Sequence, residues 1–215
     1  MSAKVTNGRN KVFSISSCMP IKENFIVSQK TQERKFDLKH FRAISNAIAT
    51  YEDFNLLANH LVEGMCRTFG IKGASIMLLD EIEQLLFRVS SHGISEAYQE
   101  KGPVCVVQRQ SVFCTGKPEY IHDFEADHRV QYPESAAREG IVSMLSIPVK
   151  FREVVIGVIR IYDDKLIDIN EEDVESLCVM ATQLGMLIEC DGLKNFVEQI
   201  KMSIDTLPPR VRGHV

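Results

Sequence analysis

Two β-prone apolar runs, joined by a short polar break, dominate the pattern of residues 138–164, which read REGIVSMLSIPVKFREVVIGVIRIYDD. Successive side chains of a strand point to opposite faces of a sheet, so a strand with one wet face should alternate apolar and polar residues. Here Val154 and Ile156 fall on one face, while Val155 and Ile159 fall on the other. We therefore predict a hairpin whose two faces are both covered.

Amphipathic periodicity predicts helices at both ends of the chain. Apolar residues recur every three to four positions along 37–51 and 54–70, and again over 174–207 with a break at Asp191 and Gly192. The last pattern is near-heptad and too long for a domain of this size to bury by itself. We predict a dimer seam there, with one long helix lying over its own sheet as the alternative. The residues assigned to the seam are Leu38, Phe41, Ile44, Val174, Leu177, Ala181, Leu184 and Ile188.

Further strands are predicted between these helices. Short β-prone runs cover 74–80, 85–92 and 119–123, and the first two form a hairpin. Pro103 and Gly116 mark the two ends of one helix that precedes the third run. Together with the hairpin at 138–164, these runs predict an α+β domain.

Composition and charge narrow the class of protein. The chain has 215 residues, of which 45% are hydrophobic and 25% charged, as in an ordinary globular protein. No apolar stretch approaches the ~20 residues that cross a bilayer, and the N-terminus lacks the apolar block of a secretory signal. We therefore expect a cytoplasmic protein without a membrane span.

The charge is unevenly distributed along the chain. The net charge is −4, but residues 1–35 carry +5 and residues 201–215 carry +2, which leaves −11 on residues 36–200. An acidic body repels phosphate backbones, so nucleic-acid binding is not expected. We interpret residues 1–35 as a flexible basic arm, 36–190 as one domain, and 191–215 as a helical extension and tail.

The six cysteines give no sign of a metal site or of a disulfide. They lie at positions 18, 66, 105, 114, 178 and 190, without the short spacings that bind zinc. Cys105 and Cys114 fall nine residues apart on one predicted helix and could not pair without unfolding it. No metal site is expected, and reduced thiols are predicted.

The order of these elements, and several of their sequences, resemble a GAF domain. GASIMLLD resembles the first strand of that family, and SVFCTGKPEYIHD resembles its helix, turn and third strand. DHRVQ, AAREGIVSMLSIPV and VVIGVIRIY follow in the order of its lid and final hairpin. The resemblance covers about residues 37–190. It implies three layers, with an antiparallel sheet of five to six strands in the order 2-1-5-4-3, terminal helices on one face, and a ligand pocket under helices and loops on the other.

The resemblance implies a non-catalytic sensor of small molecules. A ligand that closes the lid would change the packing of the terminal helices, and a homodimer would pass the signal in trans to a kinase, cyclase or transcription regulator. No catalytic residues are assigned. The predicted pocket residues are polar or aromatic side chains in or beside the strands and lid: Ser90, His92, Cys105, Phe113, His122, Asp123, His128, Tyr132 and Ser143.

Several family chemistries remain to be separated. No cysteine precedes a histidine, so a covalently attached bilin is not expected. Haem and a cyclic nucleotide stay open as cofactors, although no specific motif supports either. Two other functions also stay open: a reductase of free methionine sulfoxide that uses pocket cysteines, and a structural dimerisation module whose pocket is filled by its own side chains.

Overall fold

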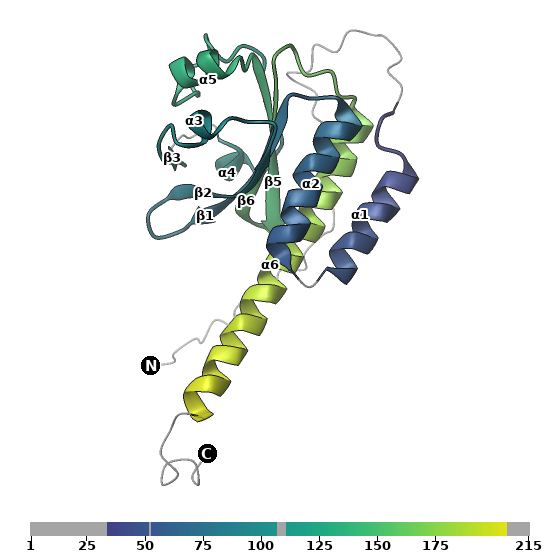
Figure 1. The fold of residues 1–215 in the computed structure, drawn as a ribbon, viewed down its shortest axis with the longest axis vertical. Helices are drawn as coiled ribbons and strands as arrows, with labels where there is room; N and C mark the ends of the chain where they lie inside the picture. The colour runs from purple at the N-terminus through teal and green to yellow at the C-terminus, as the bar shows by residue number, and fades with distance from the viewer. Residues whose placement is uncertain (1–33, 52, 107–110, 206–215) are drawn as a thin grey trace, which may run out of the picture. The chain divides into compact units, whose positions relative to one another are not determined.

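A computed structural model describes residues 34–51, 53–106 and 111–205 (Figure 1). These residues belong to one compact unit that begins at Glu33. Most of the predicted basic arm, and the tail after Asp205, lie outside the described residues. The elements are α1 (Leu38–Thr50), α2 (Phe54–Phe69), β1 (Gly73–Asp80), β2 (Leu85–His92), α3 (Glu96–Gln99), β3 (Val104–Cys105), α4 (Val112–Thr115), β4 (Glu119–Ile121), α5 (Pro133–Glu139), β5 (Ser143–Phe151), β6 (Val154–Asp163) and α6 (Glu171–Asp205).

The strands form a six-stranded antiparallel sheet in the order β3-β2-β1-β6-β5-β4. The five longer strands follow the predicted order 2-1-5-4-3 when they are counted along the chain. The difference is β3, a two-residue strand that pairs with the start of β2 at the edge of the sheet. The α+β class predicted from the sequence is therefore confirmed, with one strand added.

Both faces of the β5–β6 hairpin are covered, as predicted. Ile159 and Ile161 pack in the core under the long helices, whereas Val158 packs on the opposite face. One detail differs: Ile156 lies on the helix side with Ile159, not with Val158. The register shifts between Val149 and Lys150, which leaves Ile156 as the extra residue of a β-bulge and reverses the alternation around it.

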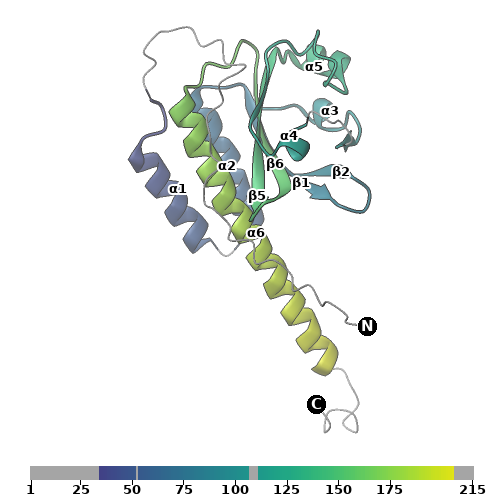
Figure 2. The same ribbon diagram turned by 180° about the vertical axis from the view of Figure 1, so that it is seen from behind.

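The helices α1, α2 and α6 form the layer on one face of the sheet (Figure 2). Asp37 and Asp53 cap α1 and α2, and their carboxylates accept hydrogen bonds from first-turn amides. The start of the described chain is fastened to this layer, because Asp173 of α6 accepts hydrogen bonds from the amides of Lys35 (3.0 Å) and Phe36 (2.9 Å). Lys35, assigned to the arm from sequence, therefore contacts the domain.

The long helix α6 corrects two predictions. It runs without interruption through Asp191 and Gly192, where the sequence analysis placed a break. The predicted seam residues of its first half, Val174, Leu177, Ala181 and Leu184, are buried in the protomer's own core. They cannot face a second chain, because the sheet already covers them. Ile188, and Phe41 and Ile44 of α1, are half-buried against the same core, and Leu38 is exposed.

The length of α6 bears on the predicted absence of a membrane span. By length and composition alone, Glu171–Ser203 could cross a bilayer, and it is the one such helix in the part of the chain that the structure describes. Its first half packs on the sheet, so burial in the protein core also accounts for its apolar composition.

The predicted helix between Pro103 and Gly116 is not formed. Val104 and Cys105 are in β3. In the described part of the segment 103–116, helical structure begins only at Val112. The edge of β2 provides hydrogen-bond partners for this segment, which a local reading of periodicity could not detect. The argument against pairing Cys105 with Cys114, which required one rigid helix, therefore no longer applies. Gly116 does end α4, with φ of 61° in the left-handed region.

Candidate functional site

A cavity of about 250 Å³ lies on the face of the sheet away from α2 and α6. We call it the larger cavity. Strands β1, β2 and β6 form its floor, and α3 with the chain that follows it forms its roof. Figures 1 and 2 show α3 on this side of the sheet. Residues lining it include Ser75, Met77, Leu86, Arg88, Ser91, Tyr98, Lys101 and Tyr162.

A row of polar residues crosses this face of the sheet. In the register of the strands, Ser91 pairs with Ser75, Ser75 with Arg160, Arg160 with Ser146, and Ser146 with Glu119. Paired residues of neighbouring strands point to the same face, so these five side chains form a continuous polar row on this face of the sheet, and Ser75 and Ser91 line the larger cavity. Burying polar groups costs free energy unless they are hydrogen-bonded. Such a row is therefore typical of a binding surface and not of a packed core.

Arg160, in the middle of the polar row, has no counterion among the residues that the structure describes. Its Nε atom is buried without a hydrogen-bond partner, and no ion pair of Arg160 is found among the described residues. It lines a second, smaller cavity of about 40 Å³ on the other side of Tyr98 and Lys101, residues that line both cavities. Arg88, which lines the larger cavity, also has no ion-pair partner in the described ranges.

Lys101 joins the two cavities. Its ammonium lies 3.6 Å from the centroid of the Tyr98 ring and donates to the Tyr98 carbonyl oxygen at 3.1 Å. Burial, followed by repulsion from Arg160 and Arg88, lowers the pKa of Lys101 to about 8, against a smaller raising effect of Glu139. The group therefore changes charge close to neutral pH.

Aromatic residues shape the wall beside Lys101. The ring of Tyr98 packs edge-on against that of Tyr162, with centroids 6.0 Å apart. The Tyr162 hydroxyl is 3.3 Å from the hydroxyl of Ser75, which links the wall to the polar row. Burial raises the pKa of Tyr98, so its phenol stays neutral.

The roof is fastened to the segment that follows β4. The Tyr132 hydroxyl donates to the carbonyl of Pro103 at 2.7 Å, and the Gln131 side chain bonds both the amide and the carbonyl of Cys105. Gly102 has φ of 124°, and a Cβ there would lie 2.8 Å from the Tyr132 hydroxyl. Only glycine fits this contact without strain.

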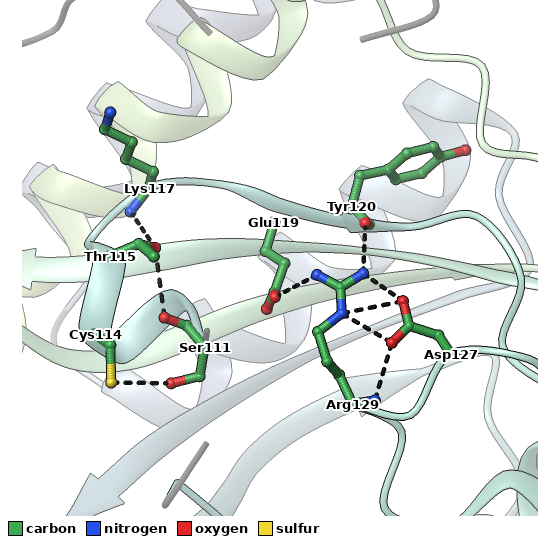
Figure 3. A network of polar contacts seen from close by, with 8 residues as sticks. All are labelled: Ser111, Cys114, Thr115, Lys117, Glu119, Tyr120, Asp127 and Arg129. Carbon is green, nitrogen blue, oxygen red and sulfur yellow. Dashed lines mark hydrogen bonds and ion pairs between the residues drawn. The ribbon is translucent and has the colours of Figure 1, made fainter. Parts of the chain in front are cut away.

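Arg129 holds that segment against the sheet (Figure 3). Its guanidinium forms an ion pair with Glu119 at 2.7 Å and another with Asp127, and it donates to the carbonyl of Tyr120. Hydrogen bonds from Arg129 are the main reason that the pKa of Asp127 is lowered. Arg129 is thus neutralised by two carboxylates, in contrast to Arg160 and Arg88.

The structure places most of the predicted pocket residues elsewhere. Tyr132 lines the smaller cavity. Ser90 faces α2 and donates to Asn59, and the Ser143 hydroxyl bonds the backbone of Lys165 and Ile167. Phe113 belongs to α4 and packs against the apolar cluster that contains Met77 and Val158. The remaining members are exposed and line neither cavity: His92, Cys105, His122, Asp123 and His128.

The residues that the sequence analysis missed are charged residues within apolar strands. Arg88 interrupts LLFRVSSH and Arg160 interrupts VVIGVIRIYDD, and a lone arginine in a mostly apolar strand indicates a polar environment at that position. That signal was available. The joining of Ser75, Ser91 and Arg160 into one row depends on strand register, which the sequence pattern did not provide.

The sequence was compared with protein families and with curated proteins. A family model described as GAF domain matches residues 52–189. A search of the curated proteins found no match.

Solved structures of similar fold come from several bacteria. A GAF domain of a phosphoenolpyruvate-protein phosphotransferase from Coxiella burnetii has a TM-score of 0.65 and 16% identity, over 74% of this chain and 95% of that chain. A domain of a putative two-component sensor histidine kinase from Sinorhizobium meliloti 1021 gives 0.57 and 18%, over 69% and 99%. Free methionine-R-sulfoxide reductase from Neisseria meningitidis, in complex with its substrate, gives 0.57 and 16%, over 69% and 86%. At these identities the likeness concerns the fold.

Proposed function

Because this chain belongs to the GAF domain family, we propose that it is a non-catalytic signalling module that binds a small molecule between its sheet and α3. The observation that carries the proposal is the larger cavity, whose floor is polar although both faces of the sheet are covered. Small-molecule sites are concave, mostly apolar, and carry a few convergent polar groups. The cavity is slightly smaller than those that hold drug-sized ligands, which favours a small metabolite.

Strand β5 offers a route from the ligand to the long helix. On one face, Ser146 belongs to the polar row; on the other, Leu145 and Ile147 pack in the core with Leu177 and other residues of α6. A ligand can shift an equilibrium only if it binds the two states with different affinity. If the ligand binds more tightly to one position of β5 than to another, its binding also changes how β5 packs against α6.

The proposed output is an altered dimer of this chain that signals to a separate effector in the cytoplasm. Exposed apolar residues recur every seven positions along α6, at Val179, Met186, Leu193 and Ile200. This heptad spacing favours a helical seam with a second copy. The seam then lies on the face of α6 opposite the sheet and along its second half, instead of on the buried face first assigned.

A reductase of free methionine sulfoxide is the competing proposal, because one protein of similar fold has that activity. Such chemistry needs a thiol at the cavity. Cys105 and Cys114 are exposed, and neither is among the residues lining the two described cavities. Burial raises the pKa of the Cys66 thiol to about 11, which makes it a poor nucleophile at neutral pH. These observations favour the sensor. Turnover of methionine sulfoxide that disappears in Cys114→Ser would overturn it.

The proposed function is tested by identifying what the protein binds. Small molecules released from freshly purified protein are measured by mass spectrometry, and candidates are then screened for an increase in melting temperature. A bound ligand that also changes amide hydrogen exchange in α6 would support sensing. If no released compound, nucleotide, amino acid, organic acid or haem stabilises the protein, the structural dimerisation module is the better account.

A further inference from the structure

We infer that the larger cavity takes a small anionic ligand. The carboxylate or phosphate of this ligand lies against Lys101, where the two cavities meet, between the guanidinium groups of Arg88 and Arg160. The inference rests on the proposed function, because it names the chemical class of the ligand at that site. It depends on the charges that line the two cavities and on the partners that these charges have or lack.

The cations around Lys101 outnumber the anions. Arg88, Lys101 and Arg160 lie close enough for the two arginines to repel the lysine ammonium. The acidic side chain that acts on Lys101 is Glu139, and its carboxylate already accepts hydrogen bonds from the amide and the hydroxyl of Ser95. The site therefore carries an uncompensated positive charge.

Arg129 shows what a compensated arginine looks like in the same region. It lines the smaller cavity together with Arg160, but Glu119 and Asp127 neutralise it. Arg160 has a buried Nε without an acceptor among the described residues, which costs free energy unless a ligand supplies the acceptor. A carboxylate or phosphate would supply the missing acceptor in the bidentate geometry that guanidinium groups favour.

A neutral or cationic ligand does not meet these conditions. A cation would be repelled by three like charges, and a neutral molecule would leave the positive charge uncompensated. The apolar side chains Met77 and Leu86, with the ring of Tyr98, can hold the body of the ligand. The anionic group would sit at the Lys101 end, which both cavities share.

The inference is tested on the full chain with three small probes: inorganic phosphate, succinate, and succinamide as an uncharged counterpart of similar shape to succinate. Binding is measured by isothermal titration calorimetry at pH 7. We expect phosphate or succinate to bind at least about tenfold more tightly than succinamide. The tighter of the two anions distinguishes a phosphate ligand from a carboxylate ligand.

Variants show whether the binding occurs in the cavity. Arg160→Gln and Lys101→Gln should each weaken anion binding about tenfold or more. Arg42→Gln, which makes the same change in charge on the exposed surface of α1, should leave it unaltered. Equal affinity of all four proteins would identify an adventitious surface ion and overturn the inference.

The two proposals can fail separately. If succinamide binds as tightly as succinate, or if the released ligand is neutral and binds Arg160→Gln normally, the anionic class is wrong while the sensor proposal stands. If no probe binds and no ligand is released or found by screening, the sensor proposal and the inference fail together.

Discussion

The ammonium of Lys101 lies 3.6 Å from the centroid of the Tyr98 ring. Both residues line the larger cavity and the smaller one. Tyr98 thus fixes a cation whose pKa is lowered to about 8 and that can lose its charge near neutral pH, whereas arginine side chains are always charged in proteins. The affinity for anions and the protonation of Lys101 should consequently be linked.

Succinate should bind more weakly as the pH rises from 7 to 9. The pKa of Lys101 is lowered to about 8, so its ammonium is mostly lost over this range, while succinate stays ionised and Tyr98 stays neutral. Calorimetry should show about a tenfold loss of affinity, with net proton uptake on binding near pH 8. In Lys101→Met the residual affinity should not depend on pH; a retained dependence would point to another group.

The stability of the ligand-free protein should depend on pH with the opposite sign. The pKa of Lys101 is about 8 in the folded state and ordinary when unfolded, so between these values the unfolded state binds more protons. This group therefore makes the folded protein more stable as the pH rises from about 8 toward its unfolded pKa. Urea unfolding of the wild type and of Lys101→Met should differ in slope against pH over that interval.

Replacing Arg160 with Met should stabilise the empty protein. The substitution removes a buried Nε that has no acceptor and one of three neighbouring positive charges, so the free energy of unfolding in anion-free buffer should rise by about 1 kcal/mol. Arg129→Met is the matched control. It leaves the carboxylates of Glu119 and Asp127 without their cation and should lower the free energy of unfolding by about 2 kcal/mol. A loss of stability in Arg160→Met would mean that Arg160 is a structural residue.

Two glycines of α6 should respond in opposite directions to alanine. A Cβ on Gly185 would lie 2.0 Å from the carbonyl oxygen of Lys150, so Gly185→Ala must push α6 away from β5 and should cost about 2 kcal/mol. Gly192 has open space around it, and Gly192→Ala should stabilise the helix by about 1 kcal/mol. Urea unfolding measures both. Equal effects would place α6 further from β5 than described.

Dimerisation through the exposed stripe of α6 should be abolished by Leu193→Glu with Ile200→Glu. Both side chains are exposed, so the variant should remain folded by circular dichroism and run as a monomer in light scattering. Asn195→Glu, on the opposite side of the helix, is the control and should remain dimeric. A substitution at Leu184 would be uninformative, because that side chain is in the protomer's own core. Dimers that survive the double substitution would place the interface elsewhere.

The features that were predictable from sequence are governed by local physics. Gly70 and Gly116 end their helices in the left-handed conformation, where glycine carries no steric penalty. The doubly covered hairpin followed from its composition alone. The strand order and layers came from the resemblance of the chain to a family, and the comparisons confirm that family.

The features that were missed are governed by contacts between distant residues. Cys105 is extended because Leu85 pairs with it across the sheet, and helical periodicity in the local sequence contains no trace of that partner. Gly192 was taken as a break, yet one glycine costs about 1 kcal/mol in a helix and a long helix tolerates it. The polar row was not predicted for a similar reason, since Ser75 and Arg160 are neighbours only through the register of β1 with β6.

The continuity of α6 past Gly192 gives the protein a stiff lever arm. Leu184 is fixed against the sheet, and Ser203 stands 19 residues further along the same helix. At 1.5 Å per residue that arm is about 28 Å long, so a tilt of only about 5° at the sheet would displace its far end by roughly 2.5 Å. A small movement at the cavity would therefore become a larger displacement at the far end of α6, where a bound partner could respond to it.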